Sequence, residues 1–422
     1  MMTTRNTIEA LPERHMTEHG LEVKARLVSE LGEKVFTTVI GGVENESQVT
    51  TLMDPWLRLL SFDMMEVGGD WEVRGTVSRS CLRNMERFND YWHSIDSTCA
   101  IVHLHAEDVF DDSAEATDNG ALLPFSGGLD ASYTAYRHTH HLADHKNLDI
   151  KAALMVHGAD IPLDKQEQFN AALHHNQEML ADLGVHKVHV IRTDYRTLGT
   201  RKFDWGYHTH MAVLIGLASF LSPMYKNVVT GSSSPFPVVP KKWGDNPISD
   251  YMLGSRIFEV HTDDFSKSRT EKAELVCNWK VGMEKLRVCW ESSFDGTGTH
   301  NCGHCEKCIR TNLNFLACGV QLPCMPVLSL KEIAANHGEI HLMRVYTSLL
   351  DYAHAHNCTD PWVPIMESKI KKCQARLAWP RLLKRVWNKA VDITTRWKFR
   401  HASTQKELWE RYNYWHNRTI PL

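Results

Sequence analysis

The residues best suited to chemistry lie in a short glycine loop, residues 126–132, with the sequence Ser-Gly-Gly-Leu-Asp-Ala-Ser. An apolar run ends at Phe125 just before the loop, and a helix-like segment follows it. Glycines let the backbone approach a phosphate closely, and the first N–H groups of a helix point at such an anion. A carboxylate such as Asp130 repels a polyphosphate unless a cation lies between them. We therefore interpret the loop as a site for Mg2+–ATP or Mg2+–pyrophosphate, with an ordinary strand-to-helix turn as the alternative.

A second set of candidate ligands consists of four cysteines, Cys289, Cys302, Cys305 and Cys308. The last three are each separated by two residues, in the run Cys-Gly-His-Cys-Glu-Lys-Cys. Cys-x2-Cys turns direct their sulfurs to a common centre, and four thiolates satisfy tetrahedral zinc. We predict a structural zinc site, with an iron–sulfur cluster or unrelated buried thiols as the alternatives. Because the ligand set is closed, we expect the ion to hold the fold together rather than to catalyse a reaction.

The elements that position the glycine loop alternate between strands and helices from residue 121 onwards. Alternation of this kind, with apolar strands, indicates a parallel, doubly wound α/β sheet covered on both faces. We expect strands at 121–125, 152–158, 188–193 and 227–231, and helices at 130–145, 164–183 and 208–222. Ligands bind such sheets outside the carboxyl ends of the strands. The loop containing Gly231 and Ser232 should therefore converge on the glycine loop.

Two cations follow the last expected strand. Residues 234–266 are rich in loop-forming residues and predict either a substrate lid or a surface excursion. The spacing of Ser268 and Glu271 then predicts a capped helix start. Arg269 and Lys272 are three residues apart, so both can point the same way. On spacing alone, solvated surface cations are the alternative. A further strand is expected at 286–290, before the cysteine cluster.

The chain divides into four expected segments. They are an N-terminal α+β extension at 1–118, an ATP-binding α/β domain at 119–285, a four-cysteine zinc-binding segment at 286–328 and a C-terminal helical region at 329–422. The last segment is locally basic and rich in tryptophan, which indicates either a partner or nucleic-acid surface or a helical cap with solvated cations. The acidic run at 107–120 is expected to be a solvated linker, and the histidines at 138, 140 and 141 to lie on the surface.

The composition bounds the class of protein. The chain has 422 residues, of which 43% are hydrophobic, as is ordinary for a globular protein. Its formal net charge of −4 gives no global attraction to nucleic acid or to anionic membranes. No apolar run reaches the length of a membrane span, and the first residues lack the apolar core of a signal peptide. Eleven cysteines without an export signal indicate reduced thiols. We expect a cytoplasmic protein with no membrane partner.

The glycine loop resembles the SGGxDS loop, or PP-loop, of the ATP pyrophosphatase superfamily. Ala131 stands where that motif usually has its first serine, and Ser132 follows one place later. With the cysteine cluster, residues 120–320 resemble QueC, the 7-cyano-7-deazaguanine synthases. The gap between Cys289 and Cys302 is longer than expected for the compact enzyme, and the flanks of about 100 residues have no counterpart there. The chain is more similar to long QueC-like proteins of bacterial antiphage operons, of the QatC type.

This resemblance implies an adenine nucleotide α hydrolase-like fold, with ATP, Mg2+ and Zn2+ as cofactors. It also implies a ligase that adenylates a carboxylate, 7-carboxy-7-deazaguanine, releases pyrophosphate and then forms an amide with an amine. The acceptor is expected on a partner protein from the same operon. Asp130 is assigned to Mg2+ binding. The catalytic residues implied are Asp130, Arg269 and Lys272, the last two as phosphate contacts. The nucleotide-binding residues implied are Ser126, Gly127, Gly128, Leu129, Asp130, Ser132, Gly231 and Ser232.

Three other functions compete with this one. An ammonia-using 7-cyano-7-deazaguanine synthase would share the adenylation step. A degenerate nucleotide-binding scaffold of a defence complex would account for Ala131. A tRNA-thiolating enzyme would need a catalytic cysteine pair in the sheet domain, and residues 121–276 contain no cysteine, which disfavours it.

Overall fold

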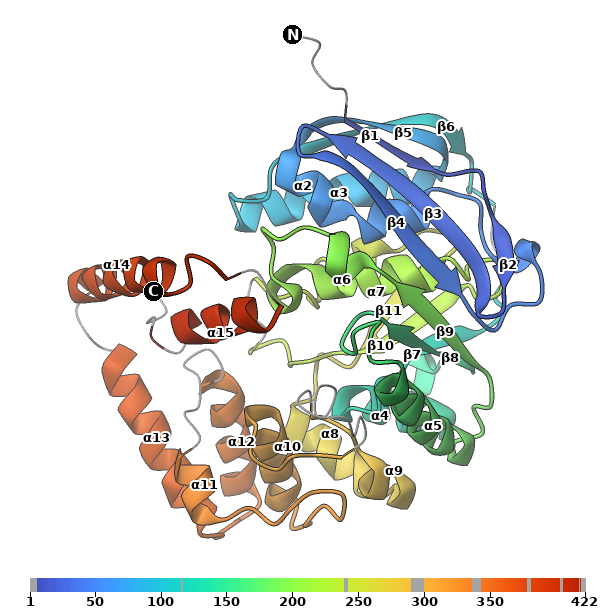
Figure 1. The fold of residues 1–422 in the computed structure, drawn as a ribbon. Coiled ribbons are helices and arrows are strands. Elements are labelled where there is room, and N and C mark those ends of the chain that lie inside the picture. Colours follow the sequence, from blue (N-terminus) through green and yellow to red (C-terminus); the bar gives the residue numbers. More distant parts are fainter. Residues whose placement is uncertain are drawn as a thin grey trace.

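The fold is built on one sheet of eleven strands (Figure 1). The computed structural model describes residues 6–114, 117–238, 242–289, 300–335, 343–377, 381–402, 405–416 and 418. The strand order is β11-β10-β7-β8-β9-β4-β3-β1-β5-β6, and β2 pairs with β3. The strands are β1 (Asn6–Ala10), β2 (His15–Thr17), β3 (Gly20–Ser29), β4 (Gly32–Ile40), β5 (Gly69–Ser78), β6 (Val102–Phe110), β7 (Ala121–Pro124), β8 (Ile150–His157), β9 (Val188–Thr193), β10 (Asn227–Gly231) and β11 (Glu259–Asp263).

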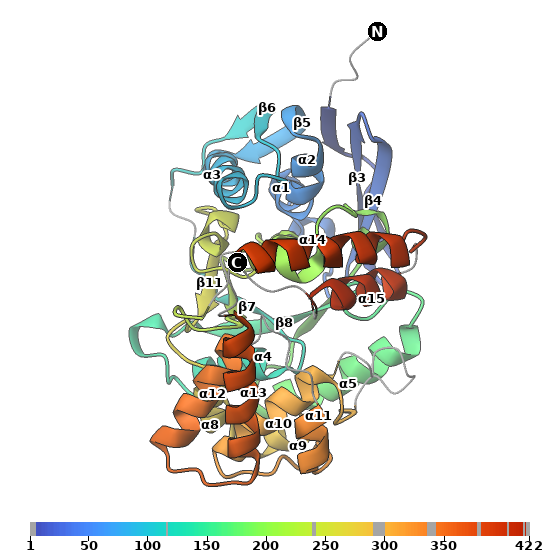
Figure 2. The same ribbon diagram turned by 90° about the vertical axis from the view of Figure 1, so that its left-hand side faces the viewer.

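Helices pack against this sheet and extend beyond it towards the C-terminus (Figures 1 and 2). The helices are α1 (Asp54–Leu59), α2 (Ser61–Val67), α3 (Arg79–Ile95), α4 (Leu129–Thr139), α5 (Gln166–Asp182), α6 (Tyr195–Leu198), α7 (His210–Ser219), α8 (Arg269–Val276), α9 (Lys280–Lys285), α10 (Glu306–Ala317), α11 (Leu330–Ala335), α12 (Met343–Ala355), α13 (Trp362–Leu377), α14 (Arg381–Lys398) and α15 (Gln405–His416). None of the described helices is long and apolar enough to cross a membrane.

Strands β7 to β11 form a continuous run of parallel strands at one end of the sheet. All four residues of β7 are buried, as are the first four of β10, which is typical of strands covered on both faces. The expected α/β class is confirmed, with a sheet that is mostly rather than wholly parallel. β7 lies in the middle, with β8 and β9 on one side and β10 and β11 on the other. The order in which successive strands are added therefore reverses between β7 and β10, although the two strands are parallel. Their carboxyl ends border the crevice where ligands bind such sheets.

The N-terminal strands continue the same sheet. β4 pairs antiparallel with β9, from Thr38 opposite Thr193 to Ile40 opposite Ile191. α1 packs closely on α7, since a Cβ at Gly216 would lie 2.7 Å from the Leu59 nitrogen. One hydrophobic core contains residues from both sides of position 118. The boundary between the first two segments stays a prediction, but the two share a sheet and a core.

Several expected elements differ in the structure. The helix expected at 130–145 ends at Thr139, and the one expected at 208–222 begins as a π-helical turn, Trp205–Thr209. Residues 286–289 form no strand, and Trp290 lies outside the described residues.

The acidic run is not a simple linker. Glu107 and Asp108 lie in β6, where they accept hydrogen bonds from the Gly75 N–H (2.8 Å) and the Thr76 hydroxyl (3.0 Å) of β5. Residues 115 and 116 lie outside the described residues. His138, expected on the surface, is buried. Its Nδ1 accepts a hydrogen bond from the Leu148 N–H at 3.0 Å. His140 and His141 are both exposed, as expected.

Asp194, just after β9, joins the two halves of the sheet by accepting hydrogen bonds from the Thr37 N–H at 3.0 and 3.1 Å. We expect Asp194→Ala to lower the free energy of unfolding by about 1–3 kcal/mol, because the Thr37 donor loses its acceptor. Urea denaturation followed by tryptophan fluorescence measures this change. Asp164→Ala, at an exposed position before α5, is the matched control. Equal midpoints for the two variants would contradict the role given to Asp194.

Candidate functional site

The glycine loop leaves the carboxyl end of β7 and enters α4. Gly127 has a φ of +74°, and a Cβ there would lie 2.4 Å from Asn176 Oδ1. Only glycine fits this left-handed and crowded position. The exposed Ser126 hydroxyl accepts a hydrogen bond from the Gly128 N–H at 3.3 Å. The strand, glycine turn and helix start expected from the sequence are therefore present in that order.

Two residues assigned to nucleotide binding are turned away from the solvent. The Leu129 side chain packs in the hydrophobic core that surrounds the cysteine cluster. Ser132 is fully buried, and its hydroxyl has no hydrogen-bond partner among the described residues. The loop therefore presents its backbone and Ser126 to the crevice, whereas Leu129 and Ser132 belong to the packing beneath it.

Asp130, in the first turn of α4, is held by two cations of α8. Arg269 Nη2 donates to the Asp130 carboxylate at 2.8 Å, and Lys272 Nζ lies 3.6 Å from it. The expected capping box fixes the start of α8, with Ser268 Oγ accepting from the Glu271 N–H and Glu271 accepting from the Ser268 N–H. The structure thus brings together the three residues assigned to catalysis, from two elements far apart in sequence.

The electrostatics of these three residues are interdependent. Burial alone would raise the pKa of Asp130, but Arg269 and then Lys272 outweigh it and hold this pKa below its usual value. Burial opposes the charge of Arg269, yet the Asp130 carboxylate raises the guanidinium pKa. For Lys272, burial prevails over the attraction of Asp130 and lowers the pKa of its ammonium group. Asp130 is therefore ionised, and its negative charge stabilises the charged forms of Arg269 and Lys272 at a site that is largely shielded from water.

Residues at the end of β10 contact both Asp130 and Lys272. A Cβ at Gly231 would lie 2.5 Å from the Asp130 carbonyl oxygen, so only glycine allows α4 to start this close to β10. The buried Ser232 hydroxyl accepts a hydrogen bond from Lys272 Nζ at 2.7 Å and donates to the Asp264 carbonyl at 3.1 Å. Gly231 and Ser232 therefore converge on the glycine loop as expected, but their visible role is to position Asp130 and Lys272.

Sequence reasoning missed a second group of acidic residues beside the crevice. Asp263 accepts a hydrogen bond from the Thr134 hydroxyl at 3.2 Å and pairs with Arg137. Asp264 accepts from the Tyr133 hydroxyl at 2.7 Å. These contacts tie α4 to the end of β11. Two successive aspartates at the end of a strand, the first of them its last residue, were the available signal.

The four cysteines expected to bind zinc lie together. Their sulfur atoms are all within 4.8 Å of one another, with Cys289 and Cys305 Sγ 4.0 Å apart and Cys302 and Cys308 Sγ 3.9 Å apart. Zinc–sulfur bonds of about 2.3 Å in a tetrahedron would separate the sulfurs by about 3.8 Å, so the cluster could hold zinc. Hydrogen bonds with Cys289 and Cys308, and then burial, raise the pKa of the Cys305 thiol. Metal binding must displace such protons.

The side chain of Asn301 joins the two parts of the cysteine cluster. Its Oδ1 accepts hydrogen bonds from the N–H groups of Val288 (3.0 Å) and Cys289 (3.2 Å), and its Nδ2 donates to the Leu286 carbonyl at 2.7 Å. The same segment touches the glycine loop, because the Arg287 N–H donates to the Gly127 carbonyl at 2.8 Å. The cysteine cluster therefore positions the loop through a single intervening backbone contact.

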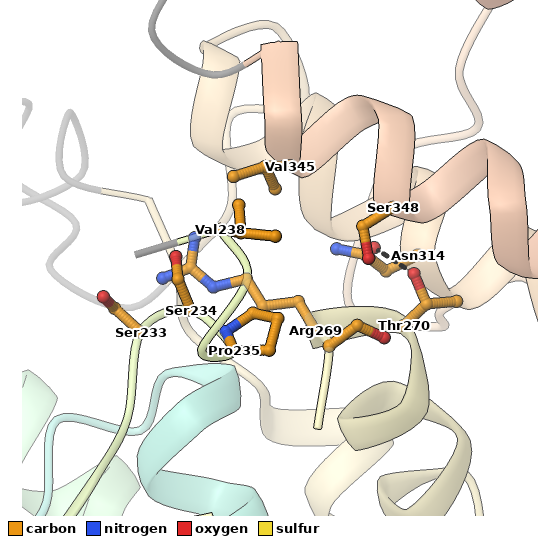
Figure 3. A pocket seen from close by; sticks show the side chains of 10 residues that line it. Ser233, Ser234, Pro235, Val238, Arg269, Thr270, Asn314, Val345 and Ser348 are labelled. Carbon is orange, nitrogen blue, oxygen red and sulfur yellow. Dashed lines mark hydrogen bonds between the residues drawn. The ribbon is translucent and has the colours of Figure 1, made fainter. Parts of the chain in front are cut away.

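Arg269 also lines a narrow pocket on the side facing α12 (Figure 3). The pocket has a volume of about 10 Å³, close to that of one water molecule. It adjoins an open groove of about 510 Å³ between the loop at 235–238 and α12.

A scan against models of known protein families gives no match, and a search of curated proteins finds no significant relative.

The cysteine cluster predicts a bound metal that can be counted. We expect the purified protein to contain one zinc ion per chain by inductively coupled plasma mass spectrometry, and Cys302→Ser to lose most of it, because three thiolates bind more weakly than four. Cys373→Ser, on α13 and outside the cluster, is the control and should retain the ion. A visible absorption band with bound iron would indicate an iron–sulfur cluster instead, and equal zinc in both variants would contradict the ligand assignment.

The contact between Gly231 and Asp130 can be tested by adding one methyl group. Gly231→Ala should lower the free energy of unfolding by about 1–3 kcal/mol, because the new Cβ meets backbone that cannot move aside freely. Gly184→Ala, where a Cβ meets nothing within 4 Å, controls for the change of residue type. Gly184 has a φ of +76°, which adds a backbone cost that Gly231→Ala does not incur, so the difference between the two variants is a lower bound on the steric cost at Gly231. Chemical denaturation of both variants measures it, and a smaller loss for Gly231→Ala than for Gly184→Ala would be inconsistent with this packing.

Proposed function

We propose that this protein is an ATP-dependent ligase that adenylates a carboxylate, with AMP and pyrophosphate as products. The observation that carries the proposal is the Asp130–Arg269–Lys272 cluster beside a glycine loop at the point where the order of the parallel strands reverses. Clustered cations next to helix N–H groups are suited to a polyphosphate, whose charge they stabilise as it leaves. A PP-loop fold is the finer form of this proposal.

The residues of this chain have separate tasks in the proposed reaction. The backbone of Ser126 to Gly128 would cradle the phosphates, and Arg269 and Lys272 would stabilise the negative charge of departing pyrophosphate. A carboxylate oxygen of the substrate attacks the α-phosphorus while the bond to pyrophosphate breaks. An amine then attacks the acyl carbon, AMP leaves and the nitrogen loses a proton. Mg2+, held through Asp130, would neutralise part of the phosphate charge.

This role of Asp130 requires that its two cations be shared with the nucleotide. A triphosphate carries more negative charge than one carboxylate, so it can draw Arg269 towards itself and leave an Asp130 oxygen for Mg2+. Lys272 has less freedom, since it is buried and hydrogen-bonded to Ser232. We therefore expect Arg269 to move and Lys272 to stay.

The substrate and partner are proposed from the resemblance to QueC-like proteins of the QatC type. The acid would be 7-carboxy-7-deazaguanine, and the amine would belong to a partner protein in an antiphage system rather than be ammonia. All eleven cysteines are free thiols, which fits a reducing compartment, and we propose a cytoplasmic location.

A nucleotide-binding scaffold is the second candidate, because three observations favour it. The charge of Asp130 is already compensated by Arg269 and Lys272, and the Ser132 hydroxyl is buried. Ala131 packs beside the core that contains Leu123 and supplies no hydroxyl.

Incubation with Mg2+–ATP, with and without 7-carboxy-7-deazaguanine, followed by separation of AMP from ADP, decides between the two. We expect AMP only with the deazapurine, and a fall of at least about 100-fold in Arg269→Gln, because the leaving group loses its counter-charge. Lys267→Gln, an exposed cation two positions earlier, should retain the activity. Bound ATP without AMP would favour the scaffold, and ADP as the product would overturn the proposal.

A further inference from the structure

A group of three possible metal ligands lies outside the four-cysteine cluster. Asp96 directly follows α3, Cys99 comes three residues later, and His208 belongs to the π-helical turn before α7. One ligand atom from each of the three lies within 4.8 Å of the other two. The group therefore joins the N-terminal segment to the sheet domain, and the proposed ligase reaction gives it no task.

The three side chains are of the kinds that bind zinc. Carboxylate oxygen, imidazole nitrogen and thiolate sulfur bind Zn2+ at about 2.0–2.3 Å, which places ligand atoms about 3.3–3.8 Å apart in a tetrahedron. His208 Nε2 lies 3.0 Å from Asp96 Oδ2. The Cys99 thiol is fully buried and forms no hydrogen bond within the described part of the chain. Small movements of these side chains would therefore bring all three to one ion.

The surroundings hold two of these side chains in place. Asp96 Oδ1 accepts hydrogen bonds from the Thr98 N–H at 3.0 Å and the Thr98 hydroxyl at 2.8 Å, which leaves Oδ2 directed at His208. The His208 ring packs against Phe62 and Trp92, with ring centroids 5.8 and 5.5 Å away. Hydrogen-bonded ligands within an apolar shell are typical of metal sites, and π-helical turns occur frequently at functional sites.

A lysine already places a positive charge at this group. Lys242 Nζ lies 2.5 Å from Asp96 Oδ2, the same oxygen that pairs with His208. The Lys242 side chain is 44% exposed, whereas that of Asp96 is only 4% exposed. Lys242 can therefore turn into solvent while the carboxylate stays where it is. An ion pair between lysine and aspartate needs neither a thiol nor an imidazole beside it, whereas a metal ion needs both.

We propose that Asp96, Cys99 and His208 form a second metal site, for Zn2+, which becomes available when Lys242 moves aside. On binding, the Cys99 thiol gives its proton to solvent, and the imidazole keeps its proton on the nitrogen that does not bind the ion. Three protein ligands leave one position for water. The ion would join the end of α3 to the start of α7. Such a site is independent of the proposed ligase function.

The number of zinc ions per chain tests the site. The full-length protein is dialysed against buffers of defined free Zn2+ concentration, and inductively coupled plasma mass spectrometry counts the bound zinc. We expect the wild-type protein to gain one ion on dialysis, because Lys242 occupies the site beforehand. Cys99→Ser should not gain this ion, since only two of the three ligands remain. Cys358→Ser, a free cysteine outside both groups, is the control and should gain it.

The competing lysine gives an independent test. Lys242→Gln should bind the additional ion at least about tenfold more tightly than the wild-type protein, because the variant removes a like charge from beside the ion. Lys280→Gln, at a side chain that is 84% exposed, is the control and should keep the wild-type affinity. Co2+ in place of Zn2+ adds a spectroscopic measurement, because a bond to the Cys99 thiolate produces a near-ultraviolet charge-transfer band that surface histidines alone do not.

Four results would overturn the site. They are a wild-type protein that gains no ion, a gained ion that persists in Cys99→Ser and is therefore adventitious, an affinity unchanged in Lys242→Gln, and bound Co2+ without the thiolate band. Cys99 is buried, so circular dichroism first compares Cys99→Ser with the wild-type protein. Should that variant unfold, Lys242→Gln and the cobalt spectrum decide, because both leave the buried ligands intact. None of these results depends on whether AMP is formed.

Discussion

The ion pairs of Asp130 with Arg269 and Lys272 are the interaction on which the site depends. They join the first turn of α4 to the first turn of α8, across 139 residues of sequence in the case of Arg269. A single carboxylate keeps two cations close together where burial would otherwise expel at least one of them. Removing Asp130 would leave like charges facing each other at a site where water is scarce. The cluster therefore keeps two cations together, and in the proposed reaction they would bind the phosphates of the nucleotide.

The parts around this cluster restrict its movement from three sides. At the end of β10, Gly231 packs against the Asp130 backbone and Ser232 accepts a hydrogen bond from Lys272. Asp264, just after β11, accepts a hydrogen bond from Tyr133 of α4. The cysteine cluster acts through Arg287, whose N–H holds the Gly127 carbonyl. The cysteine cluster and the glycine loop are thus connected through one backbone hydrogen bond. In the proposed reaction this support would matter once the nucleotide is bound and Arg269 has moved to it, because donors that stabilise developing charge must not reorganise during the chemical step.

The sequence predicts the parts of the fold that depend on local patterns. The order of strand, glycine turn and helix around Ser126, the capping box at Ser268 and the spacing of the four cysteines are all set within a few residues, and the structure confirms them. What the sequence does not reveal depends on partners that are distant in the chain. The burial of Ser132, the pairing of β4 with β9 and the inward position of His138 are of this kind. Local polarity predicts exposure, but tertiary packing decides it.

The antiparallel pairing of β4 with β9 has a consequence for the integrity of the parallel sheet. Without the first 118 residues, β9 would be an edge strand whose N–H and C=O groups along one side have no partner. Such edges pair readily with other chains and promote aggregation. By pairing with β9, the N-terminal strand β4 therefore protects this edge from pairing with other chains. A shortened chain that begins at the glycine-loop domain would retain the residues of the site and still expose a surface that favours insoluble assembly.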